Sequence, residues 1–90
     1  MIVKRKRSAK RKKGFYKSIE FSYCSDLKEI YDFLGNLGIV EYDDDSLCIK
    51  TRDGRIICAD QYLLKDDRKK KILSFDSTIF FDWFYIWQNT

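Results

Sequence analysis

Residues 47–58 read LCIKTRDGRIIC, two alternating runs on either side of an Asp-Gly pair at positions 53 and 54. Asp-Gly between two such runs is a strong signal for a β-hairpin with a two-residue turn. With that turn Thr51 faces Ile56, and residues directly opposite each other share a face of the sheet. The sequence therefore predicts a core face made of Leu47, Ile49, Thr51, Ile56 and Cys58. The outward face would carry a basic cluster beside a small apolar strip, made of Cys48, Lys50, Arg52, Arg55, Ile57 and Ala59.

A strand and a helix are expected before the hairpin. Residues 15–23 alternate between apolar and polar side chains, which is typical of a half-buried strand. Ser25 or Asp26 then caps a helix, and Gly38 is expected to end it. The apolar positions of this helix fall on one stripe, formed by Leu27, Ile30, Tyr31, Leu34 and Leu37. A short strand over 39–42 leads through an acidic turn into the hairpin.

After the hairpin the chain is expected to run extended through Leu64, turn at the charged residues 65–71 and return over 72–75. Residues 78–87 are almost entirely aromatic or β-branched, which favours a strand. Asp76 and Ser77 favour a helix because both residue types cap helices, and a C-terminal helix is the preferred interpretation, with a strand as the alternative. The predicted fold class is therefore α+β: a strand, a helix, an antiparallel meander of about four strands and the C-terminal segment, all within residues 14–90.

The net charge of +4 is divided unevenly along the chain. Residues 1–13 hold eight lysines and arginines and no acid, whereas the remaining residues hold ten lysines and arginines and fourteen acids. A segment of like charges repels itself, so the sequence predicts a disordered basic N-terminal arm over 1–13. The arm would contact the phosphates of a polyanion through Lys4, Arg5, Lys6, Arg7, Lys10, Arg11, Lys12 and Lys13; the alternative is a solubilising tail.

Several classes of activity are disfavoured by what the sequence omits. The chain has no histidine, which excludes a Ser-His or Cys-His nucleophile, and it has no glycine-rich phosphate loop. Cys24, Cys48 and Cys58 show no framework spacing, so we expect free thiols in a reducing compartment, with Cys48 and Cys58 on opposite faces of the hairpin. No apolar run reaches 18 residues. We expect no enzymatic activity, cofactor, metal or membrane, and a cytoplasmic protein, or a nuclear one in a eukaryotic host.

Two functions remain. The first is nucleic-acid binding, to duplex DNA or structured RNA, because no stacking aromatic residue is expected on the hairpin face. Its site would combine the arm with Lys50, Arg52, Arg55, Lys69, Lys70 and Lys71. The alternative is a small phage or mobile-element protein, of the anti-CRISPR or host-takeover type, that inhibits a larger nucleic-acid enzyme. It would bind through Trp83, Tyr85 and Trp87, because such residues dominate interface energies. The same apolar segment is also compatible with a homodimer.

Overall fold

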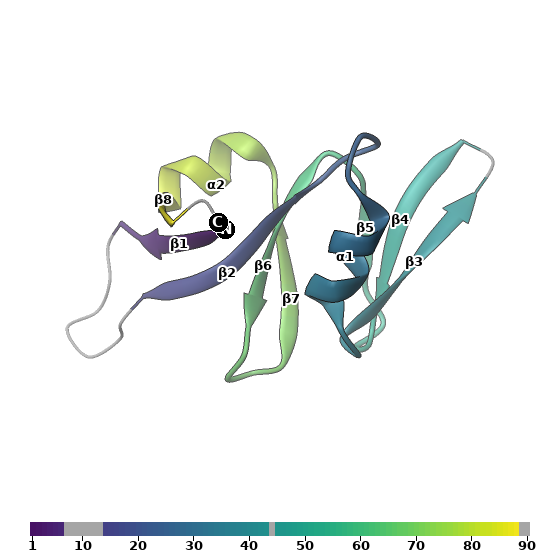
Figure 1. Cartoon of the computed structure of the whole chain (residues 1–90), viewed down its shortest axis with the longest axis horizontal. Coiled ribbons are helices and arrows are strands. Elements are labelled where there is room, and N and C mark those ends of the chain that lie inside the picture. The colour runs from purple at the N-terminus through teal and green to yellow at the C-terminus, as the bar shows by residue number, and fades with distance from the viewer. Residues whose placement is uncertain (7–13, 44, 89–90) are drawn as a thin grey trace.

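The computed structural model of the 90-residue chain describes residues 1–6, 14–43 and 45–88. They form an α+β protein with two helices and two antiparallel sheets, 45 Å long and 22–23 Å across (Figure 1). The predicted α+β class is confirmed, but the described residues hold eight strands, more than the predicted meander supplies. Neither of the described helices is long and apolar enough to cross a membrane.

The larger sheet has five strands in the order β7-β6-β2-β1-β8. Their bounds are Ile2–Arg5 for β1, Phe15–Phe21 for β2, Gln61–Asp66 for β6, Lys71–Phe75 for β7 and Phe84–Gln88 for β8. Helix α2, Ser77–Trp83, connects β7 to β8. The two ends of the chain therefore meet as paired strands, with Val3 opposite Ile86.

The smaller sheet has three strands in the order β3-β4-β5, Gly38–Asp43, Ser46–Thr51 and Ile56–Cys58, and helix α1, Leu27–Leu34, precedes it. Asp26 caps α1 as predicted, because its carboxylate accepts a hydrogen bond from the Lys28 amide at 2.9 Å. The predicted end at Gly38 is wrong. The helix ends at Gly35, where φ is 56°, a conformation that glycine adopts without strain.

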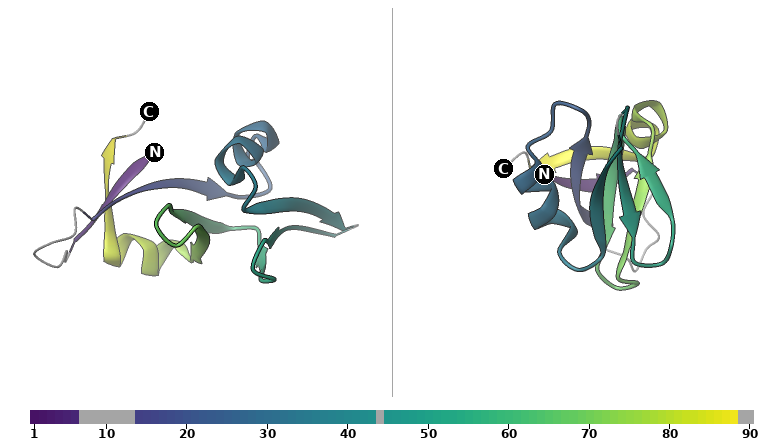
Figure 2. Two further views of the ribbon diagram at one scale, coloured as in Figure 1. Left: turned by 90° about the horizontal axis from the view of Figure 1, so that it is seen from below. Right: turned by 90° about the vertical axis from the view of Figure 1, so that its right-hand side faces the viewer.

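Two hydrophobic cores lie on opposite faces of the five-stranded sheet. Neighbouring residues of a strand point to opposite faces, so Leu63 enters one core and Leu64 the other. The first core lies under α1 and includes Ile30 and Leu34; the second includes Phe80 of α2. Figure 2 shows α1 and α2 on opposite sides of β2. The second core stabilises the end of the sheet where β1 pairs with β8, and the candidate site lies at this end.

The predicted arm is wrong for residues 1–6. Strand β1 lies between β2 and β8, and Val3 is fully buried. The Met1 amino group donates to the Ser18 carbonyl and the Ser18 amide donates to the Met1 carbonyl, both at 2.9 Å. The apolar residues Ile2 and Val3 therefore favour a paired strand here, although cations follow them in the sequence. The rest of the predicted arm, 7–13, lies outside the described residues.

The C-terminal segment is a helix followed by a strand. Asp76 caps α2 by accepting a hydrogen bond from the Ile79 amide at 2.9 Å, as the capping argument predicts. The prediction of helix is wrong beyond Trp83, because Phe84 has extended dihedral angles and begins β8. The capping residues therefore indicate the helix in the first half of the segment, and the aromatic and β-branched composition indicates the strand in the second half.

The predicted register of the central hairpin is wrong by one residue. Ile49 faces Ile57, and the loop has three residues, 52–54, with a φ of 90° at Gly54. The Thr51 hydroxyl accepts a hydrogen bond from the Arg55 amide at 2.9 Å, which stabilises this longer loop. A shift of one residue exchanges the two faces of a strand, so Ile57 is buried while Ile56 is 68 % exposed.

The shift also corrects the placement of two thiols. Cys48 and Cys58 occupy directly opposite positions on β4 and β5 and so share the outer face of the small sheet. They were predicted on opposite faces because a two-residue turn pairs Cys58 with Ile49 instead.

Candidate nucleic-acid interface

Charge is segregated between the two ends of the molecule. Residues 1–21 and 61–90, which include every strand of the large sheet, have fourteen lysines and arginines and five acids, a formal charge of +9; five of these cations belong to segment 7–13, outside the described residues. The three-stranded half, residues 22–60, has four lysines and arginines and nine acids, a formal charge of −5. The molecule is 45 Å long, several times the Debye length of about 8 Å at physiological salt, so the two ends act separately on an approaching ligand.

The basic segment 7–13 joins two neighbouring strands of the sheet. The Arg5 amide donates to the Gly14 carbonyl at 2.8 Å, so the described chain before the segment lies beside the chain that follows it. Lys6 adds two further contacts, from its amide to the Trp83 carbonyl at 2.8 Å and from its Nζ to the Phe81 carbonyl at 2.6 Å. Five of the predicted phosphate-binding residues lie in this segment, outside the described residues: Arg7, Lys10, Arg11, Lys12 and Lys13.

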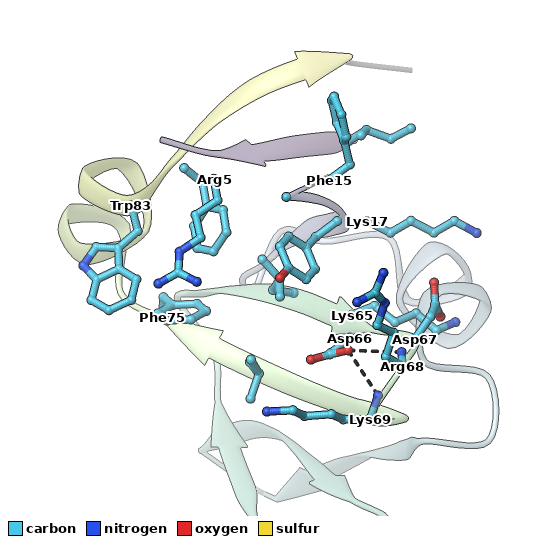
Figure 3. A pocket seen from close by; sticks show the side chains of 16 residues that line it. Arg5, Phe15, Lys17, Lys65, Asp66, Asp67, Arg68, Lys69, Phe75 and Trp83 are labelled. Carbon is cyan, nitrogen blue, oxygen red and sulfur yellow. Dashed lines mark hydrogen bonds between the residues drawn. The ribbon is translucent and has the colours of Figure 1, made fainter. Parts of the chain in front are cut away.

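A half-open groove of about 530 Å³ lies beside the ends of this segment, between β1–β2 and the β6–β7 turn (Figure 3). Its lining combines aromatic rings with cations: Tyr16, Phe75 and Trp83 with Arg5, Arg68 and Lys69. Volumes of several hundred cubic ångströms are typical of small-ligand sites. The groove can therefore accept a flat ring together with an anionic group.

Trp83 and Arg5 form one wall of the groove. The Arg5 guanidinium carbon lies 5.4 Å from the centre of the Trp83 ring, and Figure 3 shows the guanidinium between Trp83 and Phe75. Trp83 ends α2, which Asp76 caps and Phe80 anchors in the second core. Despite this anchoring the Trp83 side chain is 50 % exposed, so a ligand can reach its ring.

The β6–β7 turn forms the opposite wall. The Asp66 carboxylate accepts hydrogen bonds from the amides of Arg68 at 3.1 Å and Lys69 at 3.2 Å, which holds the turn in place. Asp66 and Asp67 also place two negative charges at this wall. Of the predicted cations here, Lys69 lines the groove, Lys70 occupies the turn and Lys71 begins β7.

The opposite face of the same sheet end carries a second aromatic cluster, and one of its residues, Phe15, also borders the groove. Phe15 and Trp87 meet edge to face with ring centres 5.1 Å apart. The Lys4 ammonium lies 5.2 Å from the Phe15 ring and 5.6 Å from the Trp87 ring. Tyr85 lies directly opposite Lys4 and so shares this face. Of the three predicted partner-binding aromatic residues, Trp83 therefore lies in the groove, whereas Tyr85 and Trp87 lie on the opposite face of the sheet.

The three hairpin cations do not form the predicted basic face. Lys50 lies on the outer face of the small sheet, opposite the exposed Ile39 and Ile56. Arg52 is exposed in the loop. Arg55 instead donates from Nη2 to the Ile72 carbonyl and from Nε to Asp53, and this is the single ion pair in the described part of the chain. None of the three lines the groove.

The groove depends on residues that sequence reasoning did not single out, above all Tyr16 and Phe75. Nothing in the sequence brings these two residues near Arg5, because the pairing of β1 with β2 and β8 places them together. The basic run 68–71 is the one sequence feature that points to the wall formed by the β6–β7 turn. No protein-family model, curated protein or solved structure matches the chain.

Proposed function

We propose that the chain is a non-catalytic nucleic-acid-binding protein that engages its ligand with the five-stranded half. The observation that carries the proposal is the excess of cations on that half, whose described residues include nine lysines and arginines and five acids, against four and eight on the other half. Contacts between cations and phosphates release condensed counterions, and this supplies most of the sequence-independent affinity for nucleic acids. The acidic half orients the molecule, since phosphates repel it.

The anchoring of segment 7–13 distinguishes this proposal from a solubilising tail. The hydrogen bond between Arg5 and Gly14 means that the chain on both sides of these five cations belongs to the end of the sheet that carries Lys4, Arg5 and Lys6. A charged tail that only keeps a protein soluble has no need of such a connection. The aromatic rings that line the groove add a second reason, because bases stack on such rings.

The proposed role is binding without chemistry. The chain has no histidine to act as a general base near neutral pH. Asp66, one of the carboxylates that line the groove, accepts two backbone hydrogen bonds and so stabilises the turn.

A second candidate function is inhibition of a larger nucleic-acid enzyme by protein contact, and strand β8 favours it. The strand lies at the edge of the sheet, so a partner strand could pair with it. Its side chains Tyr85, Ile86 and Trp87 are 38–55 % exposed. Under this proposal, W87A reduces inhibition of the partner enzyme while neutralising 7–13 has little effect.

The decisive experiment neutralises segment 7–13 without removing β1. The variant R7Q/K10Q/R11Q/K12Q/K13Q keeps the chain length, and its binding to duplex DNA is measured across a salt series. Loss of five phosphate contacts makes the log–log salt slope shallower by about 4–5. The control variant K28Q/K50Q/R52Q removes cations from the acidic half and leaves the slope unchanged. Equal slopes for the two variants would refute the proposal.

A further inference from the structure

We propose that the groove binds an unpaired base of a single-stranded nucleic acid, stacked on Trp83, with an adjoining phosphate at Arg5. This inference deepens the proposed function and rests on it. The sequence favours duplex DNA or structured RNA because the hairpin face lacks aromatic residues. The aromatic rings of the groove lie on a different surface, formed by β2, β7 and α2.

The size of the groove suits a single nucleotide and excludes a double helix. Its volume of about 530 Å³ lies within the range of about 300–1,000 Å³ that holds small ligands. In a duplex the faces of the bases are stacked on each other, and only their edges and the phosphates meet a protein. A ring that enters between Trp83 and the β6–β7 turn must therefore come from an unpaired base.

Trp83 offers the stacking surface. Its side chain is half exposed although its helix is capped by Asp76 and its neighbour Phe84 is buried. Tyr16 and Phe75 extend the apolar wall behind it, and both contact Phe84, with ring centres 5.9 Å and 5.8 Å away. This contact fixes the wall before a ligand arrives, so little ordering has to accompany binding.

Arg5 is the phosphate-binding group of the groove. No carboxylate lies within ion-pair distance of its guanidinium among the described residues. The fork geometry of a guanidinium matches two phosphate oxygens, and its flat face also stacks on an aromatic ring. Arg5 already lies over Trp83 at 5.4 Å, so the base and its phosphate would be bound by neighbouring groups.

The acidic residues of the groove determine which path the backbone of the bound nucleic acid takes. Asp66 and Asp67 repel phosphate from the middle of the β6–β7 turn, although Arg68 and Lys69 flank them. Arg5, which ends β1, and Lys6, which follows it, line an adjoining pocket with Trp83 and one acid, Asp82, so cations are in excess there. The backbone of the bound nucleic acid therefore passes Arg5 and Lys6, and its base points into the groove.

The two tryptophans of the chain provide the test, because they lie on opposite faces of the sheet. The variant W87F leaves Trp83 as the sole tryptophan, and W83F leaves Trp87. Each is titrated with the oligonucleotide (dT)12 and with a 12-base-pair duplex while tryptophan emission is recorded. We expect (dT)12 to quench the emission of W87F and the duplex to leave it nearly unchanged, whereas W83F responds to neither.

Affinity supplies the second readout. Alanine substitution of a stacking residue weakens single-strand binding by about 5- to 150-fold. We expect such a loss for W83A on (dT)12 and less than about twofold on the duplex, with W87A as the matched control. Thermal unfolding followed by circular dichroism shows that each variant is folded, and R5Q tests the phosphate contact without changing an aromatic ring.

The outcomes separate the two proposals. Equal binding of duplex and (dT)12 without quenching of Trp83 overturns the single-strand assignment and leaves nucleic-acid binding intact. Quenching in W83F instead of W87F overturns the choice of the groove and places the base on the Phe15–Trp87 face. If the intact chain binds neither oligonucleotide at low salt, the proposed function fails as well.

Discussion

Cys48 and Cys58 face each other across β4 and β5 with their sulfur atoms 3.6 Å apart. At the next pair along the hairpin, the Ala59 amide donates to the Leu47 carbonyl at 3.0 Å, so the cysteines occupy a non-hydrogen-bonded pair. The Cα atoms of such pairs are about 4.5 Å apart, the closest spacing in an antiparallel ladder. Disulfides form at Cα separations of about 4.4–6.8 Å, so the hairpin can be cross-linked without moving its backbone.

We predict that mild oxidation joins Cys48 and Cys58. With oxidised glutathione, the two thiols give up two electrons and two protons to form one disulfide, and the oxidant is reduced to two glutathione thiols. The number of free thiols then falls from three to one, and the cross-link stabilises the fold by up to about 3 kcal/mol. The hydrogen bond with Cys48 raises the pKa of the Cys58 thiol, so fewer thiolates are present near neutral pH and the reaction accelerates as the pH rises.

Titration of free thiols and peptide mapping check this prediction. C58S should retain both of its thiols under the same conditions, and C24S should still form the cross-link. Glutathione attached to separate cysteines, with no internal disulfide, would contradict the observed pairing.

A second prediction distinguishes the two possible hairpin registers. I57A should lower the free energy of unfolding by about 2–4 kcal/mol, because Ile57 packs in the first core beside Ile49. I56A should change it by less than about 0.5 kcal/mol, because that side chain is 68 % exposed. Urea denaturation of the two variants measures the difference in their free energies of unfolding. A larger loss of stability in I56A than in I57A would instead support the two-residue turn.

The hairpin shows what local sequence can and cannot predict. The Asp53-Gly54 pair correctly predicts the position of the turn, but a glycine with positive φ suits both a two-residue and a three-residue loop. The Thr51 hydroxyl decides between them by binding the Arg55 amide, a contact with no sequence signature. The caps at Asp26 and Asp76 were predictable because each acts on its own helix within three residues.

Arg55 gives a third prediction, because it links the small sheet to the large one. Its Nη2 donates to the Ile72 carbonyl on β7, and its Nε donates to Asp53 at 3.1 Å. R55A should lower the free energy of unfolding by about 1–2 kcal/mol, a value reduced by the partial exposure of the ion pair. The exposed Arg52 is the matched control, and R52A should be close to neutral in the same urea titration. Equal effects would show that the bond to β7 adds no stability.

The groove could not be predicted because its walls come from four separate parts of the sequence. Arg5, Tyr16, Phe75 and Trp83 meet only once β1 has paired with β2 and β8. The sequence shows the excess of cations in residues 1–13, and this excess predicts one disordered arm. That prediction gave too little weight to the apolar residues Ile2 and Val3, which form part of a strand. The charge of residues 1–13 therefore suggested a polyanionic ligand, which stays a prediction, whereas the end of strand β1 could be located only from its pairing with β2 and β8.

The final prediction concerns that boundary. V3A should lower the free energy of unfolding by about 1–3 kcal/mol, because Val3 is fully buried in the second core with Leu64 and Phe84. Removal of residues 1–6 should unfold the five-stranded half, since β8 would lose its neighbour in the sheet. The variant R7Q/K10Q/R11Q/K12Q/K13Q should unfold at nearly the same urea concentration as the intact chain, which separates a loss of charge from a loss of structure. If V3A were as stable as the intact chain, Val3 would not be packed in the sheet, and the pairing that brings Arg5 to Gly14, on which the proposed nucleic-acid interface rests, would be contradicted with it.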